Sequence, residues 1–336
     1  MFSPAEILRV ALFGAGGYGT THARLLEQSH GDGGLRFVAV ADPSSAKLSG
    51  LRADLESKGV RWFDDYRELL GELSGSLDAV VISTPIPLHL PMLEAAMDRG
   101  LAVLLEKPPV PVVQDFLRLD ARPEARRVAG ACQRLASPNL WRLKRAMLDG
   151  ALGRIHRMAA TACWPRRDSY YNRAAWSGHL AWNGLPVLDG PTTNALAHIV
   201  HNLMFLAGET PEAFAVPETV RAELYRARPI ESYDLCCVGG CWASGVEFVA
   251  AFTHAAEQTV DWSLVGAGSE GRRGSTGGAF PWILAKMPPP ARRTTRTCRR
   301  RAGSISSARR PAIKPSRSRP SLTAGPTSRP PTRCSF

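Results

Sequence analysis

The sequence predicts an α/β protein with two domains, an N-terminal doubly wound parallel sheet and a C-terminal α+β domain with an open, mainly antiparallel sheet. Continuous apolar runs alternate with helical stretches over residues 1–131, and a glycine-rich loop follows the first run. Alternating runs then follow one another between residues 219 and 265. Continuous runs are typical of strands buried on both faces, and alternating runs of antiparallel strands buried on one face.

The glycine loop is the strongest motif. It follows the apolar run 7–13, and its residues are Gly14, Ala15, Gly16, Gly17, Tyr18 and Gly19. The first glycine permits a tight turn, Gly16 lets backbone N–H groups approach a pyrophosphate, and Gly19 lets a helix pack close to its strand. A tight turn without a ligand is the alternative, but the strand-loop-helix context favours a dinucleotide.

Asp42 ends a second apolar run, 35–41, and lies 23 positions beyond Gly19. Such folds place a carboxylate there on the adenosine ribose. An acid at this point repels a 2′-phosphate, so the sequence favours NAD over NADP. Ser44, Ser45 and Lys47 could rearrange around a phosphate, which keeps NADP open.

Further βα units complete the first domain. We expect helices at 46–58 and 87–100, and strands at 60–62, 79–83, 101–105 and 127–131. A ligand in this type of fold lies at the carboxyl ends of the strands. The residues expected at that edge are Ser83, Thr84, Pro85, His89, Glu106 and Lys107.

The second domain is expected to span residues 132–266. Helices are expected at 139–149 and 195–206, on either side of an aromatic and arginine-rich stretch at 164–182. Four alternating runs follow, at 219–228, 233–242, 246–253 and 259–265, and predict an antiparallel sheet.

Charge divides the chain unevenly. The 336 residues carry a net charge of +12, but residues 266–336 hold 16 Lys and Arg and one acid, Glu270. Residues 1–265 therefore carry −3, and the basicity says nothing about the surface of the main domains.

The cysteines and the apolar runs indicate the compartment. Seven cysteines without paired spacing favour reduced thiols, and we expect Cys236, Cys237 and Cys241 to be buried small residues and not a metal site. No uninterrupted stretch of about 18 apolar residues occurs, and no signal segment is recognisable. We therefore expect a cytoplasmic protein without membrane contact or metal.

Lys107 lies directly after the fifth strand. Pro108 restricts it to extended geometry and permits a cis bond, which would aim the ammonium into the cleft. A surface lysine beside a turn is the alternative.

These motifs together resemble the Gfo/Idh/MocA family of oxidoreductases, from about residue 6 to residue 265. The motifs that match in order and spacing are 14–19, 83–89, 106–108, 137–138 and 150–155. The resemblance implies a Rossmann domain, a second domain for substrate and oligomer contacts, and NAD(P)-dependent hydride transfer at a sugar or polyol carbon. It also places Tyr170, Tyr171 and Trp176 at the substrate pocket; core or interface packing is the alternative for these three rings.

The family's second signature has an Asp and a His one helical turn apart, with another Asp three residues beyond. In this chain Asn194, His198 and His201 occupy those positions. An amide cannot stabilise an imidazolium as a carboxylate does. We expect His198 to act as base and Lys107 to polarise the substrate oxygen; a core histidine is the alternative for His198. Packing and substrate contact remain open for His201 and Asn202.

The end of the sequence departs from this pattern. Residues 271–336 contain no acid, although residues 1–270 contain 30. This composition, rich in Arg, Pro and Ser, indicates an out-of-frame translation, so we expect residues 267–336 to be a disordered tail and the second sheet to be truncated. Family members continue with further strands and a closing helix, so we expect uncovered sheet surface and poor solubility.

The function expected is that of an NAD-dependent oxidoreductase acting on a sugar, inositol or related polyol, in a homo-oligomer where the family fold is intact. A catalytically silent regulator that senses nucleotide is the first alternative, supported by Asn194. A nucleic-acid-binding protein that uses the basic tail is the second, and we expect it least.

Overall fold

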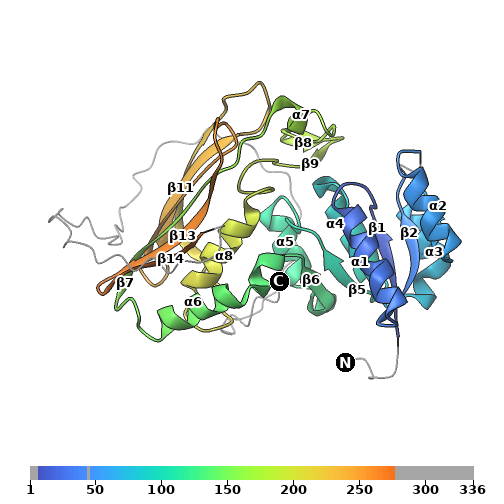
Figure 1. Cartoon of the computed structure of the whole chain (residues 1–336), viewed down its shortest axis with the longest axis horizontal. Helices are drawn as coiled ribbons and strands as arrows, with labels where there is room; N and C mark the ends of the chain where they lie inside the picture. Colours follow the sequence, from blue (N-terminus) through green and yellow to red (C-terminus); the bar gives the residue numbers. More distant parts are fainter. Residues whose placement is uncertain (1–6, 44–45, 277–336) are drawn as a thin grey trace, which may run out of the picture.

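The computed structural model describes residues 7–43 and 46–276. They form two domains that lie beside one another, with helices of the second domain between its sheet and the first domain (Figure 1). The fold class predicted from the sequence is confirmed: a parallel sheet is followed by a second, mainly antiparallel sheet.

The first sheet has six parallel strands in the order β3-β2-β1-β4-β5-β6. The chain crosses from one side of β1 to the other between β3 and β4, so the carboxyl ends of β1 and β4 border a crevice where a ligand is expected. The strands are β1 (Leu8–Phe13), β2 (Leu35–Ala41), β3 (Arg61–Phe63), β4 (Ala79–Ile82), β5 (Ala102–Leu105) and β6 (Val128–Gly130).

Helices cover both faces of this sheet. Successive residues of β1 enter opposite core clusters, since Leu12 packs in one cluster and Phe13 in the other, and both are fully buried. The helices are α1 (Gly19–Gly31), α2 (Ser49–Ser57), α3 (Tyr66–Leu73), α4 (His89–Met97) and α5 (Val113–Asp120), with the 3-10 turns η1 (Ser74–Ser76), η2 (Ile86–Leu88) and η3 (Pro123–Arg127).

The second sheet has the order β10-β11-β12-β7-β13-β14. Its neighbours are antiparallel except β12 and β7, which are parallel. Its strands are β7 (Ile155–Cys163), β10 (Pro217–Tyr225), β11 (Leu235–Trp242), β12 (Glu247–Thr253), β13 (Val260–Gly268) and β14 (Gly271–Thr276).

One face of this sheet packs on helices. The third core cluster joins α6 (Pro138–Leu148) and α8 (Ala197–Ala207) to the inward residues of the strands, among them Met158, Phe252 and Leu264. The remaining elements are η4 (Gln133–Ala136), α7 (Asp168–Tyr171) and a small hairpin of β8 (Ala181–Trp182) and β9 (Leu185–Pro186).

The structure corrects three expectations for this domain. The central strand β7 was not predicted, because its alanine-rich sequence alternates only weakly. Cys237 is exposed, because strand alternation turns it away from buried Cys236. The sheet also continues past the expected boundary at residue 267, because the backbone of β14 pairs with β13 without any apolar pattern.

The expectation of a disordered, out-of-frame tail otherwise concerns residues 277–336, which lie outside the described residues. Among the described helices, none is long and apolar enough to cross a membrane.

Candidate active site

The glycine loop has the backbone geometry that glycine alone allows. Gly14 has φ +83°, and a Cβ there would lie 2.6 Å from the carbonyl oxygen of Ser83. A Cβ on Gly19 would lie 2.1 Å from the carbonyl oxygen of Gly14, so α1 packs directly against the loop. By contrast, no described atom lies within 4 Å of a Cβ built on Gly17. The loop is therefore closed against its own sheet and open where a diphosphate would approach the N-terminus of α1.

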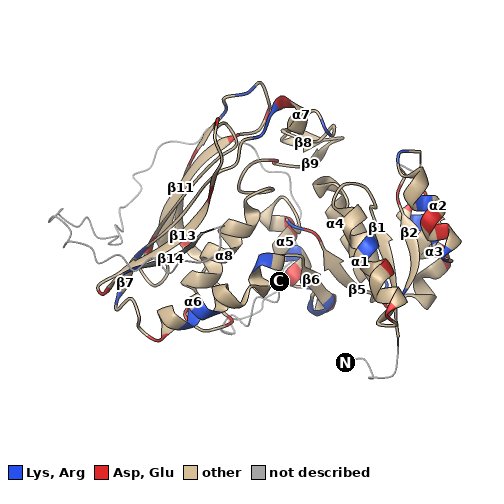
Figure 2. Cartoon of the chain, viewed as in Figure 1, with Lys and Arg blue, Asp and Glu red and all other residues tan. Residues whose placement is uncertain are grey.

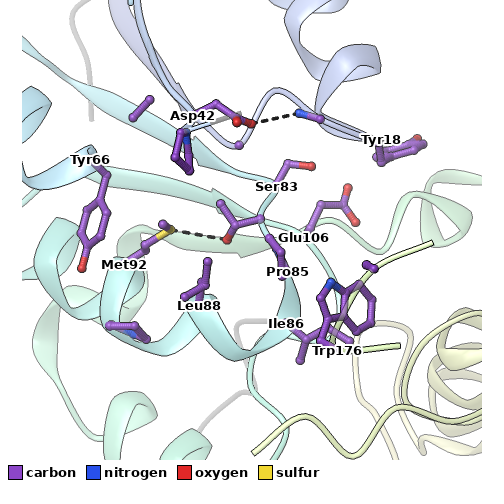
Figure 3. Close-up of a pocket in the computed structure, with 18 of the residues that line it drawn as sticks. Tyr18, Asp42, Tyr66, Ser83, Pro85, Ile86, Leu88, Met92, Glu106 and Trp176 are labelled. Atoms are coloured by element: carbon purple, nitrogen blue, oxygen red, sulfur yellow. Dashed lines mark hydrogen bonds between the residues drawn. The ribbon is translucent and has the colours of Figure 1, made fainter. Parts of the chain in front are cut away.

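Asp42 lies at the end of β2 and turns toward this loop. Its Oδ2 accepts hydrogen bonds from the backbone N–H groups of Ala15 (2.8 Å) and Gly16 (3.2 Å). Figure 3 shows the Asp42 carboxylate joined to this loop. The side chain is 6% exposed. This places a carboxylate beside the glycine loop at the end of β2, where Rossmann folds bind the adenosine ribose.

A cavity of about 900 Å³ runs from the glycine loop to the boundary with the second domain (Figure 3). Ala15, Gly19 and His89 do not line it. The sequence-predicted residues that do line it are Gly14, Gly16, Gly17, Tyr18, Asp42, Ser83, Thr84, Pro85, Glu106, Lys107, Trp176 and Asn194.

His89 therefore has a different place from the one expected. It is 1% exposed, and its two ring nitrogens lie 2.8 Å from the carbonyl oxygen of Pro108 and 2.9 Å from that of Thr84. Burial lowers the pKa of its imidazole. His89 joins the loop after β4 to the loop after β5, and the expected cofactor contact is corrected to a structural one because the ring lies beneath the cavity floor.

Glu106 is held by a residue that the sequence analysis did not single out. The Nε2 atom of His22, on α1, lies 2.9 Å from Glu106 Oε1, and both side chains are about nine-tenths buried. The other oxygen, Oε2, accepts from the N–H of Lys107 at 3.2 Å. The carboxylate of Glu106 is thereby fixed between α1 and the loop that carries Lys107.

Lys107 crosses from the first domain to the second. Its peptide bond to Pro108 is cis. Its ammonium donates to the carbonyl oxygen (2.9 Å) and the side-chain Oδ1 (3.2 Å) of Asn194. Burial lowers the pKa of this amine, and nearby Glu106 opposes the shift. A buried lysine with a lowered pKa is suited to proton transfer and to polarising an oxygen.

Asn194 is oriented by a carboxylate that sequence reasoning missed. Its Nδ2 donates to Asp189 Oδ1 at 2.9 Å and lies 3.4 Å from the Tyr170 hydroxyl. Asp189 is 3% exposed, and its Oδ2 accepts from the N–H of Gly178 at 2.8 Å. Because the amide nitrogen faces Asp189, the amide oxygen faces Lys107. The only sequence signal was a lone acid after the apolar residues 185–188.

The helix carrying the two histidines begins later than predicted. Residues 191–196 form turns and α8 starts at Ala197, so Asn194 is not one regular helical turn before His198. Tertiary bonding of Asn194 to the first domain competes with helix formation here.

His198 is partly buried at the start of α8, and its Nδ1 has no hydrogen-bond partner in the described chain. Burial, with Lys107 and Arg134 nearby, lowers its pKa to about 4. The imidazole is thus neutral at pH 7 with a free lone pair, and its low pKa makes it a weak base. Neither His198 nor His201 lines the cavity. His201 packs its ring against Phe214, with 4.7 Å between the ring centroids, which favours packing for this residue.

Tyr170 and Trp176 bring aromatic surface to the domain boundary. Trp176 lines the cavity beside Ile86 (Figure 3), whereas Tyr170 contacts the site through Asn194. Tyr171 stacks edge-on with Tyr170, and its buried hydroxyl has no partner in the described chain. Among the described residues, no group of three His, Cys, Asp or Glu residues could hold a metal ion.

Fold and site together define a nucleotide-binding Rossmann domain joined to a second domain that adds side chains at the cavity mouth. Residues 8–129 match the family model described as the oxidoreductase family with an NAD-binding Rossmann fold. The first domain is thus similar to the NAD-binding domain of the Gfo/Idh/MocA family.

Two curated relatives are inositol 2-dehydrogenases. Inositol 2-dehydrogenase 4 of Saccharopolyspora erythraea is 36% identical over 150 residues, and inositol 2-dehydrogenase of Streptomyces avermitilis is 34% identical over 154 residues. The matches cover 44% and 45% of this chain and 43% of each relative. The chain thus matches less than half the length of these relatives.

Solved structures match over more of the chain. The WlbA dehydrogenase of Bordetella pertussis, in complex with NADH and UDP-GlcNAcA, has a TM-score of 0.70 at 25% identity and covers 84% of each chain. A myo-inositol dehydrogenase of Corynebacterium glutamicum has a TM-score of 0.61 at 20% identity over 84% of this chain and 79% of its own. The second likeness shows the fold alone.

Proposed function

We propose that this protein is an NAD-dependent oxidoreductase that transfers hydride between a nicotinamide and the carbinol carbon of a sugar, inositol or related polyol. The observation that carries the proposal is the contact of Lys107 with Asn194, at the mouth of the cavity that begins at the glycine loop. The family and the NADH-bound neighbour support a nicotinamide cofactor.

The glycine loop and the cavity beside it fit such a cofactor. The open side of Gly17, the N-terminus of α1 and the carboxylate of Asp42 supply the diphosphate and ribose ends, while Glu106 and Lys107 border the other end of the cavity. When bound, NAD supplies the hydride acceptor. Asp42 favours NAD over NADP, because a 2′-phosphate would meet its charge.

The chain's own residues supply the proton chemistry. The hydroxyl of the substrate must lose its proton as hydride leaves, and neutral His198 is the acceptor. The Lys107 ammonium lies where it donates to the developing carbonyl oxygen, so it stabilises the charge that forms there. Asp189, through Asn194, keeps Lys107 in place.

This arrangement weakens the case for a catalytically silent regulator. That alternative depended on Asn194 lacking the charge of the family's carboxylate. In this chain Asp189 brings a buried carboxylate to the same amide at 2.9 Å.

The test has two readouts. NADH binding is titrated by fluorescence, and NAD reduction is followed with myo-inositol, hexoses, uronates and sugar alcohols, using Lys107→Ala as the inactive control. Binding with Lys107-dependent reduction supports the proposal. Binding without reduction by any member of the panel would favour nucleotide sensing.

A further inference from the structure

A row of alternating arginine and aromatic side chains lies beside the site just described. Arg134 stacks over Trp262 (5.5 Å from the guanidinium carbon to the ring centroid) and lies 6.0 Å from Trp164. The guanidinium carbon of Arg166 lies 6.0 Å from the ring centroid of the same Trp164 and 4.9 Å from that of Tyr170. We call Arg134, Arg166 and Arg173 the arginine row.

Arg173 completes the row and brings it to the cavity. Its guanidinium lies 3.5 Å from the Tyr170 ring centroid and 5.1 Å from that of Trp176, and it lines the cavity together with Lys107. Two of these arginines flank α7, where Figure 2 shows basic segments on the adjoining loops.

The row runs along the reacting groups of the proposed site. The ring of Tyr170 contacts both Arg166 and Arg173. The hydroxyl of the same residue lies 3.4 Å from Asn194 Nδ2. Arg134 helps to lower the pKa of His198, and Arg173 helps to lower that of Lys107. Two of the three guanidinium groups therefore act electrostatically on the proposed proton-handling residues, Arg134 on His198 and Arg173 on Lys107.

No carboxylate in the described part of the chain forms an ion pair with these three arginines. The nearby acids have other partners: Asp189 bonds Gly178 and Asn194, Glu106 bonds His22, and Asp168 and Asp234 pair with Arg228. The Nε of Arg166 is buried without a hydrogen-bond partner in the described chain. With Lys107, four cations lie in this part of the domain boundary, and two of them, Lys107 and Arg173, line the cavity.

Ring contacts hold these guanidinium groups and use only part of their hydrogen-bonding capacity. Arg173 Nη1 donates to the carbonyl oxygen of Tyr170 at 2.5 Å, and Arg166 hydrogen-bonds the Tyr170 side chain. A ring contacts the flat face of a guanidinium, while its N–H donors lie in the plane and remain able to bind a carboxylate or phosphate in bidentate fashion. Cations gathered in a half-buried site without a counter-charge are costly, and an anionic ligand offsets that cost.

We propose that the substrate carries an anionic group, a carboxylate or a phosphate on the sugar or cyclitol, and that the arginine row binds it. This inference rests on the proposed function, because it assigns the substrate class of the same site. Arg166 is the central contact, since it stacks between Trp164 and Tyr170. Arg173, which lines the cavity, also binds the anionic group.

The experiment uses the full chain saturated with NADH and isothermal titration with D-glucose, D-glucuronate and D-glucose 6-phosphate. At low salt we expect one of the two acidic sugars to bind at least about tenfold more tightly than glucose, as a charge-assisted contact implies. The preference should weaken as NaCl rises from about 50 mM to about 300 mM. The tighter acid identifies carboxylate or phosphate as the source.

Variants separate recognition from packing. Arg166→Gln should lose about tenfold in affinity for that acid and leave glucose and NADH binding unchanged. Arg166→Lys keeps the charge and packing volume but not the planar fork, so it should recover only part of the loss. Arg142→Gln removes a charge from an exposed arginine of α6 that bonds Asn139, and should behave as the parent protein.

Equal binding of glucose and both acids, or no binding of either acid, would overturn the proposal, as would an equal loss of NADH affinity in Arg166→Gln. Failure of the proposed function has a different signature. An Arg166-dependent preference for an acid without any NAD reduction would leave this anion site standing and contradict the oxidoreductase.

Discussion

The two sheets of this protein expose their residues in opposite ways. In β1 of the first sheet, neighbouring Leu12 and Phe13 are both 0% exposed. In β12 of the second, Phe248 is 7% exposed and its neighbour Val249 is 42% exposed. The first sheet has helices on both faces, and the second has α6 and α8 on one (Figure 1).

Because of this difference, the two domains contribute different kinds of groups to the site. A sheet covered on both faces can offer a ligand only the loops at its strand ends, so the first domain contributes backbone N–H groups, Asp42 and Lys107. The second domain places an irregular segment, residues 164–196, over that opening. It contributes side chains, and the site exists only where the two domains meet.

The largest expected effect separates the stability of the two domains. Lys144 is fully buried, and its ammonium donates to the carbonyl oxygens of Phe205 (2.6 Å), Gly208 (2.5 Å) and Ala213 (3.2 Å). Burial lowers its pKa to about 8. Lys144→Met removes the ammonium from all three acceptors, of which the Phe205 carbonyl oxygen keeps the backbone N–H of Gly208 at 3.2 Å. It should lower the free energy of unfolding of the second domain by about 3 kcal/mol.

Urea unfolding monitored by tryptophan fluorescence and by NADH binding checks this prediction. NADH binding should persist after the second domain loosens, because the first domain has separate cores. Simultaneous loss of both signals at an unchanged midpoint would show that Lys144 does not hold the second domain.

The next effect separates binding from turnover. Lys107→Ala should lower kcat by about 100-fold or more, while the Kd for NADH changes by less than about twofold, because in the proposed mechanism the lysine acts on the substrate oxygen and not on the nucleotide. Lys58→Ala, at an exposed lysine bonded to Glu27 and Asp54, is the matched control and should leave both constants unchanged. A Lys107 variant with normal kcat would remove this residue from the chemistry.

His198 links the second domain to pH. Its pKa of about 4 lies below the ordinary histidine value of 6.5, so the folded protein keeps the imidazole neutral where an unfolded histidine would be charged. Stability from this residue is therefore present above about pH 6.5 and is lost as the pH falls through about 4. The kcat/KM profile should fall on the acid side with a midpoint near 4 in the parent protein.

His198→Ala should lower kcat by about 100-fold and remove that limb of the profile. An acid limb centred near 6.5, or one that persists in the variant, would assign the titration to another group.

The smallest effect concerns the first domain alone. Asp42→Ala should narrow the preference for NADH over NADPH by several-fold, on the order of 1 kcal/mol, because repulsion of the 2′-phosphate is removed. Fluorescence titration with both nucleotides gives the ratio. Equal or tighter NADPH binding by the parent protein would show that Asp42 does not contact the ribose.

The sequence was most informative where structure is local. The glycine loop, Asp42 and the strands around them follow from short patterns, because each needs only its neighbours to fold. The strand β7 escaped prediction, since its pairing with β12 and β13 and not its alanine-rich sequence makes it a strand.

The site was predictable only in its separate pieces. Lys107 and Asn194 are 87 positions apart, and no sequence pattern indicates that their hydrogen bond forms. Asp189 was missed because it lies outside the family signature, and His89 was misplaced because the end of a strand does not reveal which way a side chain turns. Long-range contacts of this kind need the tertiary fold.

The most direct test of a site shared between the domains is a double-mutant cycle on kcat with Lys107→Ala and Asn194→Ala. Asn194→Ala should cost about tenfold in the parent protein and less than about twofold when Lys107 is already absent, because the amide acts by holding the ammonium. NADH affinity measured in all four proteins should stay constant. An equal, additive tenfold loss in both backgrounds would contradict the account.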